Sequence, residues 1–223
     1  VPPLPGRRIL PEHEAYPLLA PFGVTTSSHA LVKSADVAAA LYRQSGKPVA
    51  LKIQSPDIIH KSDAGGVVLG VDSETAVREA YEAIMEQVPA DARIDGILVQ
   101  EMAPPGVEII LGVTMDPRFG ALIIVGLGGV FVEVMGDVAF APAPLGPAEA
   151  RDMLERLKAW PLLTGVRGTA PADVDALVDV MIGLSRFAWA YRHAIEEIDL
   201  NPVLVHPQGR GVTVVDALIV QSK

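Results

Sequence analysis

Apolar residues recur along this chain in two spacings, one typical of helices and one typical of strands. Over residues 74–88 they fall at intervals of three and four, which places them on one stripe of a helix that packs against a sheet. Ser73 precedes this stretch and Ser34 precedes a second one, residues 35–45, and serine is a favoured N-cap residue. Gly46 follows the second stretch, as glycine commonly does at a helix C-terminus. The pattern predicts helices over residues 35–45 and 74–88.

Three further stretches have helical features, and each has a proline at or near its start. Proline is tolerated in the first turn because its missing N–H would have had no partner there. Pro17 lies deeper inside the first of these stretches, where it removes one backbone hydrogen bond. Helices are expected over residues 12–19, 147–159 and 171–192.

Short apolar runs bounded by glycine, proline and polar residues predict strands. Most runs are joined by tight turns, such as residues 104–106 and 115–120, so neighbouring strands are expected to pair antiparallel. Helices mixed with a mostly antiparallel sheet define an α+β (α/β) fold class in two layers or two subdomains. Strands are expected on both sides of the loop within residues 49–69 and at residues 97–101, 107–114, 121–125, 130–135, 138–141, 196–200, 203–205 and 212–220.

The chain is expected to divide into three parts. Residues 1–11 carry several prolines, which block both helix formation and strand pairing, and so predict an extended arm. A polar loop near Asp95 precedes the long run of strands. We place the boundary there, between a first subdomain of residues 12–96 and a second of residues 97–223.

Composition excludes several classes of function. The net charge of −9 over 223 residues argues against general nucleic-acid binding, which needs a basic face. No apolar run approaches the ~20 residues of a membrane span, so no membrane partner is expected. The absence of cysteine excludes disulfides and thiolate chemistry and fits a cytoplasmic protein. No signal peptide is visible, and the missing initiator methionine fits a fragment or a processed chain.

The stretch from Val49 to Leu69 has the pattern of a hairpin with a polar, glycine-containing tip. Lys52 lies in its first apolar run, and cationic groups with flexible glycines are suited to phosphate binding. An ordinary surface hairpin would show the same pattern. The residues that could contact phosphate are His60, Lys61, Ser62, Gly65 and Gly66. A neutral imidazole at His60 could accept a phosphoryl group as a nucleophile or act only as a hydrogen-bond donor.

Oxygen ligands gather near the end of the chain. Glu197, Asp199 and Asn201 alternate, which puts them on one face of an extended segment. Asp216 lies on the returning strand and can sit opposite them. Such a set suits Mg²⁺, which takes one or two carboxylates together with substrate phosphates. A polar strand edge facing water is the alternative.

Two more positions are candidates for ligand contact. Gln100 and Glu101 end a strand beside a Pro-Pro-Gly turn, with Glu108 just beyond it, which is a natural lip for a pocket. Gly126–Gly129 could hold a phosphate through backbone N–H groups or could be a tight turn between strands.

Several of these segments together resemble one known family, the ATP-grasp domain of NDP-forming acyl-CoA synthetases. The ADP-forming acetyl-CoA synthetase β subunit is its type, and succinyl-CoA synthetase β is a more distant relative. The resemblance covers about residues 12–220, and the motifs are more specific together than singly. They are Leu51–Val67, Leu98–Met102, Glu108 with Gly112–Gly120, Gly126–Glu133, Leu163–Gly168, and Glu197–Pro202 with Asp216.

The resemblance implies an ATP-grasp fold, in which two subdomains grip ATP or ADP between them. It implies that Lys52 contacts the phosphates, that the loop at residues 60–66 covers them, and that Gln100 and Met102 flank the adenine. Asn201, Asp216 and the nearby Asp199 match the Mg²⁺ ligands. Glu108 and the glycines Gly126, Gly128 and Gly129 match the place where a partner's phosphohistidine docks, and His60 matches a proposed second phosphoryl carrier.

The implied reaction is acyl-CoA + ADP + phosphate ⇌ acid + CoA + ATP, through acyl phosphate and phosphohistidine. No part of this chain matches the CoA-binding domain that bears the principal phosphohistidine. A partner domain or subunit is therefore expected, with a small carboxylic acid and CoA binding to the complete enzyme. One departure is Leu218, which stands where the family usually has arginine.

Two other functions are known for chains that share such motifs or this fold. Related chains fused to GNAT-type acetyltransferases act as non-catalytic nucleotide sensors, but the retained Lys52, Glu108, Asn201 and Asp216 favour catalysis. A carboxylate–amine ligase would use the same fold, and the loop around His60 and the turn at residues 116–120 disfavour it.

We predict that Mg·ATP radiolabelled on its terminal phosphate labels His60 weakly, because a neutral imidazole near the phosphates can act as a nucleophile. The His60→Ala variant should lose the label, measured on protein that is denatured with detergent and kept at alkaline pH, where phosphohistidine is stable. A His193→Ala variant serves as the control and should keep it. Unchanged labelling of the His60→Ala variant would contradict the relay role.

Overall fold

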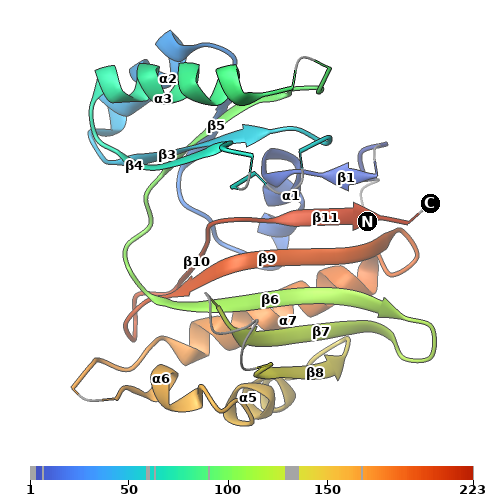
Figure 1. The fold of residues 1–223 in the computed structure, drawn as a ribbon. Helices are drawn as coiled ribbons and strands as arrows, with labels where there is room; N and C mark the ends of the chain where they lie inside the picture. The colour runs from blue at the N-terminus through green and yellow to red at the C-terminus, as the bar shows by residue number, and fades with distance from the viewer. Residues whose placement is uncertain are drawn as a thin grey trace. The chain divides into compact units, whose positions relative to one another are not determined.

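The computed structural model describes residues 4–222 apart from residues 7, 59–60, 63, 90, 129–135 and 167 (Figure 1). His60, Gly129 and the strand expected at residues 130–135 therefore lie outside the described residues. The chain forms two compact units. Unit 2 comprises residues 27–103, and unit 1 comprises residues 1–26 together with residues 104–223.

Unit 2 is a four-stranded antiparallel sheet with two helices, and its strand order is β2-β5-β3-β4. Both helices begin where predicted; α2 also ends as predicted, and α3 ends one residue earlier, at Gln87. The Val37 N–H donates to Ser34 Oγ, the Ala76 N–H donates to Ser73 Oγ, and Gly46 takes a left-handed conformation with φ of 64°. The elements are β2 (His29–Val32), α2 (Ala35–Ser45), β3 (Val49–Gln54), β4 (Val67–Val71), α3 (Glu74–Gln87) and β5 (Gly96–Glu101).

Strand alternation divides the side chains of the unit 2 sheet between two faces. Leu51 and Ile97 point to the helix side, where they join a core cluster with Val77 of α3. The residues next to them along β3 and β5 point the other way. The face opposite the helices therefore presents Lys52 and Gln100.

Unit 1 is a seven-stranded antiparallel sheet of order β1-β11-β9-β6-β7-β8, with β10 paired to β9. In Figure 1 the long helix α7 runs along one face of this sheet, where it contacts β6, β7 and β9. The strands are β1 (Ile9–Leu10), β6 (Val107–Asp116), β7 (Gly120–Leu127), β8 (Val138–Pro142), β9 (Ile195–Val205), β10 (Val212–Val214) and β11 (Leu218–Gln221). The helices are α1 (Glu12–Leu19), the 3₁₀ helix η1 (Ala20–Phe22), α5 (Pro147–Glu155), α6 (Trp160–Thr164) and α7 (Val174–Ala190).

An aromatic cluster forms part of the unit 1 core. Phe187 of α7 is fully buried. Its ring meets Phe22 edge to face at 5.2 Å between centroids and Tyr191 at 4.6 Å. Such pairs stabilise a core beyond the area they bury.

The observed units differ from the boundary expected between residues 96 and 97. The strand that begins at Gly96 pairs with β2 and β3, so it completes the sheet of unit 2 rather than beginning unit 1. The N-terminal arm is also shorter than expected, because Ile9 and Leu10 pair with β11. Both differences come from pairings between residues distant in sequence.

Smaller differences concern the ends of elements. The helix expected from residue 171 begins at Val174, because the side chain of Asp173 accepts a hydrogen bond from the Ala176 N–H and caps it. The two strands expected within residues 196–205 form one long strand, β9. The helix α6 and the strand β2 were not predicted. No helix among the described residues is long and apolar enough to span a membrane.

We predict that Phe187→Ala lowers the free energy of unfolding by about 3–5 kcal/mol, because it opens a cavity in the unit 1 core. Urea denaturation monitored by circular dichroism measures the change. The control is Phe119→Ala at a residue that is 64% exposed, which should stay within about 0.5 kcal/mol of wild type. Equal effects of the two substitutions would contradict this description of the core.

Candidate functional site

Acidic side chains lie in a row on β9, on the sheet face that α7 does not cover. Ile198 and Leu200 are buried, so Glu197 and Asp199 point to the opposite face. Asp199 pairs in register with Gly112 of β6 on one side and with Leu218 of β11 on the other. Asn201 continues the row and is exposed, and Asp216 precedes β11. These residues, Glu197, Asp199, Asn201 and Asp216, are the acid row.

The acid row is electrostatically strained at Asp199. Burial of its carboxyl group, the larger cause, and the negative charges of Asp216 and Glu197 together raise the Asp199 pKa to about 6. The predicted metal ligands Asp199 and Asp216 thus lie close enough to repel each other. A bound cation would relieve that repulsion.

The donor set of the acid row fits Mg²⁺. Within the described ranges no three His, Cys, Asp or Glu side chains are placed to hold a metal ion by themselves. The predicted site offers two carboxylates, Asp199 and Asp216, and the amide oxygen of Asn201. Mg²⁺ commonly binds one or two carboxylates and takes its remaining oxygens from water and substrate phosphates.

Leu218 stands where the resembling family usually has arginine, and its position in the sheet shows which residue that arginine would face. It lies directly across the strand pair from Asp199, so an arginine there would have faced the carboxylate. A leucine supplies no charge to offset the acid row. The raised Asp199 pKa agrees with that arrangement.

Glu108 and Gly128, predicted together from motifs, are in contact. The Gly128 N–H donates to the Glu108 carbonyl oxygen at 2.7 Å. A Cβ at Gly128 would lie 2.9–3.0 Å from Glu108 atoms, so only glycine fits. At Gly126 a Cβ would lie 2.9 Å from the Asp137 carbonyl oxygen and from Val138 Cγ1. Close packing of the strands therefore accounts for both glycines, and Gly129 lies outside the described residues.

Unit 2 carries a second group of predicted residues on the sheet face opposite its helices. Ala50 pairs with Gln100 and Lys52 pairs with Leu98, which makes Lys52 and Gln100 diagonal neighbours on adjacent strands. Both are almost completely buried, at 5% and 2% exposure. The Gln100 Nε2 has no hydrogen-bond partner among the described residues. A buried amide left without a partner costs about 1–3 kcal/mol, so this group is suited to meet a ligand.

The loop after β3 uses its glycines differently from what we expected. The Gly66 N–H donates to the Lys61 carbonyl oxygen at 2.7 Å, and the Gly65 N–H donates to the Ser62 carbonyl oxygen at 3.2 Å. Gly66 also packs against Ile53, where a Cβ would come within 2.4 Å of Cγ2. These N–H groups close the loop on itself and do not point to a phosphate. Any contact from this part of the loop would come from the side chains of Lys61 and Ser62.

Met102 follows β5 with its side chain 40% exposed, and its N–H donates to the Pro48 carbonyl oxygen at 2.9 Å. It comes two residues after Gln100, as the motif required. Lys52 and Gln100 therefore share one side of the unit 2 sheet, whereas Gly66 packs against Ile53 of the helix-side core. The residues of β9 in the acid row and Glu108 share one side of the unit 1 sheet.

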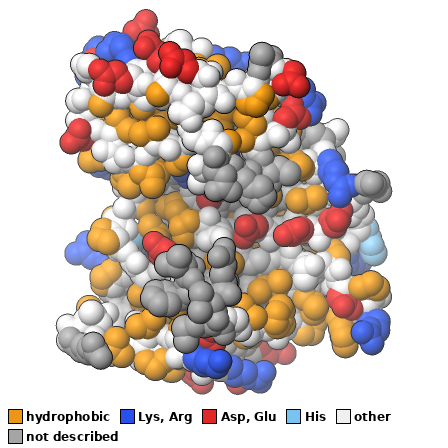
Figure 2. All heavy atoms as spheres, in the orientation of Figure 1, with side chains coloured by type: hydrophobic (Ala, Val, Ile, Leu, Met, Phe, Trp, Pro, Cys, Tyr) orange, Lys and Arg blue, Asp and Glu red, His pale blue; other side chains and the backbone are white. Residues whose placement is uncertain are grey.

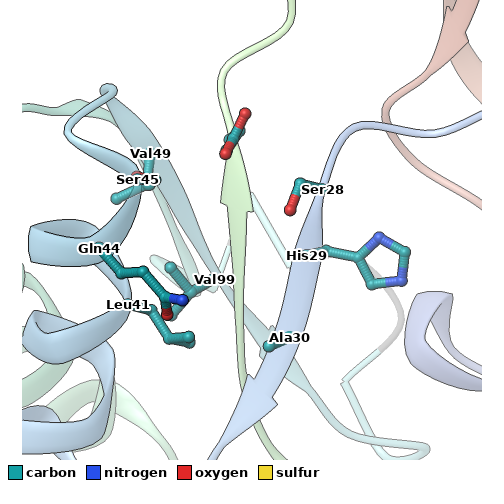
Figure 3. Close-up of a pocket in the computed structure, with 9 residues that line it drawn as sticks. Ser28, His29, Ala30, Leu41, Gln44, Ser45, Val49 and Val99 are labelled. Carbon is teal, nitrogen blue, oxygen red and sulfur yellow. The ribbon is translucent and has the colours of Figure 1, made fainter.

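A cavity of about 320 Å³ in unit 2 was not predicted. It lies between α2 and the strands β2 and β5, on the helix side of the sheet. Figure 3 shows Leu41 and Gln44 of α2 extending toward Val99, with the His29 ring directed away from them. Its lining comes from separate stretches of sequence, so no motif could have indicated it. Lys52 and Gln100 lie on the opposite side of the sheet.

The chain belongs to the ATP-grasp family, because the family model for the ATP-grasp domain matches residues 5–220. Its relatives are ADP-forming acyl-CoA ligases. The β subunit of ADP-forming acetate–CoA ligase II from Pyrococcus furiosus is 42% identical over 218 residues, which cover 96% of this chain and 92% of that subunit. ADP-forming acetate–CoA ligase I from Archaeoglobus fulgidus is 41% identical over 202 residues, which cover 89% of this chain but only 29% of that one.

Solved structures agree with this assignment. The dinucleotide-forming acetyl-coenzyme A synthetase 1 of Ca. Korarchaeum cryptofilum, in complex with coenzyme A and Ca-AMPCP, matches with a TM-score of 0.92 and 46% identity over 97% of this chain and 95% of that one. Another structure of that protein, with Mg-AMPPCP and a phosphohistidine segment pointing towards the nucleotide site, matches with a TM-score of 0.84 and 43% identity over 97% and 94%. The predicted ATP-grasp fold is thereby confirmed.

We predict that metal-free protein loses stability as the pH rises from about 4 to 6 through the titration of Asp199. The folded-state pKa of about 6 lies above the usual value of about 3.9, so the folded state binds the extra proton in this window. The Asp199→Asn variant should lack this contribution. Urea denaturation in EDTA at pH 5 and pH 8 measures it.

The control for this prediction is Asp179→Asn, at an exposed carboxylate of α7. It should keep the difference between pH 5 and pH 8 that wild type shows. An Asp199→Asn variant with the wild-type difference would contradict the raised pKa.

Proposed function

We propose that this chain is the ATP-grasp part of an ADP-forming acyl-CoA synthetase. It binds Mg·ATP or Mg·ADP and transfers a phosphoryl group between the nucleotide and a histidine of a CoA-binding partner domain or subunit. The observation that carries the proposal is the buried Gln100 Nε2, which has no partner in the part of the chain that the structure describes, beside the buried Lys52, because both groups are suited to a polar ligand. Family membership and the relatives support it.

Each residue then has a role that follows from its chemistry. Lys52 contributes positive charge to the phosphates, and Gln100 and Met102 contact the adenine. Asp199, Asn201 and Asp216 hold the Mg²⁺, which when bound offsets charge on the phosphates. Lys61 and Ser62 approach the phosphates from the loop that contains His60, the proposed second phosphoryl carrier. Glu108, with Gly126, Gly128 and Gly129, marks the place where the partner's histidine docks.

The complete reaction is acyl-CoA + ADP + phosphate ⇌ acid + CoA + ATP, and this chain carries out its nucleotide half. Phosphoryl transfer depends mainly on positioning and on stabilisation of charge. The ammonium of Lys52 and the metal held by the acid row supply that positioning and charge stabilisation. The acyl group and CoA bind on the partner.

A nucleotide-sensing domain without catalysis is the second candidate, and Leu218 is the observation that favours it. An apolar residue opposite Asp199 leaves the acid row without a cation at a position where the family usually has one. Such a domain would bind Mg·ATP in the same way. Formation of ATP from acyl-CoA, ADP and phosphate by the complete protein would exclude it.

We predict that Lys52→Met weakens binding of Mg·ATP by about tenfold or more, because a charge-assisted contact contributes about 1.5–3 kcal/mol. Isothermal titration calorimetry measures the dissociation constant. The control is Lys47→Met, because Lys47 is exposed and pairs with Glu101 at 2.8 Å between Nζ and Oε2. Lys47→Met should bind as wild type does. A wild-type protein that does not bind Mg·ATP would overturn the proposed function.

A further inference from the structure

Apolar side chains occupy the part of the unit 1 sheet that lies beside the acid row. Ile124 of β7 pairs with Phe140 of β8, and Leu122 pairs with Pro142. Phe140 is 55% exposed and Val138 is 37% exposed. Figure 2 shows hydrophobic side chains gathered over β7 and β8 on this face. The residues Leu122, Ile124, Val138, Phe140 and Pro142 are named the apolar platform.

The helices of unit 1 do not cover the apolar platform. Ile123 and Val125 alternate with its residues along β7 and are fully buried on the side of α5 and α7. The strand β8 also ends the sheet order, so its outer edge has no strand partner among the described residues. An exposed apolar patch next to an open edge is typical of a surface that binds protein.

The apolar platform is continuous with the acid row. Phe140, Ile124, Gly112 and Asp199 pair in turn across four adjacent strands. With about 4.8 Å between strands, Phe140 and Asp199 are about 14 Å apart along this line. Gly112 has no side chain, so no side chain projects from the sheet between Ile124 and Asp199. A segment lying on the platform would reach across Gly112 to the metal ligands.

The shape of the surface favours a protein segment over a small molecule. Two cavities in unit 1, of about 300 and 350 Å³, are lined by residues of α6 and the start of α7 and by residues around η1 and β10, so neither opens on the platform. The platform itself lies along two neighbouring strands of an open sheet face. An extended or helical segment with apolar side chains fits such a surface.

The relatives indicate which protein segment would bind to the apolar platform. In Archaeoglobus fulgidus the matching region is 29% of a single chain, whereas in Pyrococcus furiosus it is nearly all of a separate subunit. In either arrangement the remainder of the enzyme must reach the nucleotide from outside this region. A docking surface on this chain is therefore required, and the apolar platform adjoins the proposed metal ligands.

We propose that the apolar platform is the docking surface for the segment of the CoA-binding partner that carries the phosphoryl-accepting histidine. This inference rests on the proposed function. During transfer, a neutral imidazole nitrogen forms a bond to the γ-phosphorus while the bond from that phosphorus to the β,γ-bridging oxygen breaks. ADP leaves with the bonding electron pair, and the other ring nitrogen keeps its proton. The platform holds the flanking apolar residues while this exchange occurs.

The test uses the complete synthetase, with this chain and its CoA-binding partner both present. Phe140→Ser should slow the labelling of the partner histidine by terminally labelled Mg·ATP by tenfold or more, measured by rapid quench. The dissociation constant for Mg·ATP should change less than twofold. Phe119→Ser, at a phenylalanine that is 64% exposed on the turn between β6 and β7, is the matched control and should label at the wild-type rate.

A photoreactive benzoylphenylalanine at Phe140 provides a second measurement, with Phe119 again as the control position. A crosslink from position 140 to the histidine-bearing part of the partner supports the proposal. A crosslink to a second copy of this chain, or an unchanged labelling rate in Phe140→Ser, would overturn it. Failure of the wild-type enzyme to bind Mg·ATP would instead refute the proposed function, so the two failures can be told apart.

Discussion

The alternation of side chains along a strand is the constraint on which the rest of the structure depends. Each sheet gives one face to helices, and that face carries aliphatic residues such as Leu51 in unit 2 and Ile123 in unit 1. The residues next to them in sequence must then lie on the other face. A slip of one residue in β9 would turn Asp199 toward α7 and expose Ile198. The register that builds the core therefore also builds the candidate site.

The sheet faces that point away from the helices hold groups that are unfavourable in the absence of a ligand. The carboxyl group of Asp199 is partly desolvated beside two like charges, and the Gln100 Nε2 is buried with no partner among the residues that the structure describes. Each arrangement costs free energy of folding, of the order of 1–3 kcal/mol for a buried unsatisfied group. Binding a cation and a nucleotide would recover that cost, because a ligand that binds only the folded state stabilises it. The site is thus prepared for charge and hydrogen bonds that the chain does not itself provide.

Local chemistry made much of this structure predictable. Serine caps and a terminal glycine located α2 and α3, and the family motifs brought Glu108 together with Gly128 and Asp199 with Asp216. Features that depend on distant partners were not predictable. The strand at Ile9 pairs with Val220, and the lining of the unit 2 cavity comes from separate segments. Phe140 has the sequence of an ordinary strand residue, and only its register with Ile124 shows which face it occupies. The sequence likewise does not reveal that the Gly65 and Gly66 N–H groups donate to carbonyl oxygens of their own loop.

The insertion of unit 2 within unit 1 has a consequence for how the protein assembles. All strands of unit 2 lie between residues 27 and 103, so that sheet can form as soon as this stretch has left the ribosome. The unit 1 sheet can be completed only later, because β1 (Ile9–Leu10) pairs with β11 (Leu218–Gln221). Its contacts span nearly the whole chain, which makes them slow to form. Leu218 and its partner Asp199 lie on β11 and β9, so the acid row belongs to the part of the protein that is completed last.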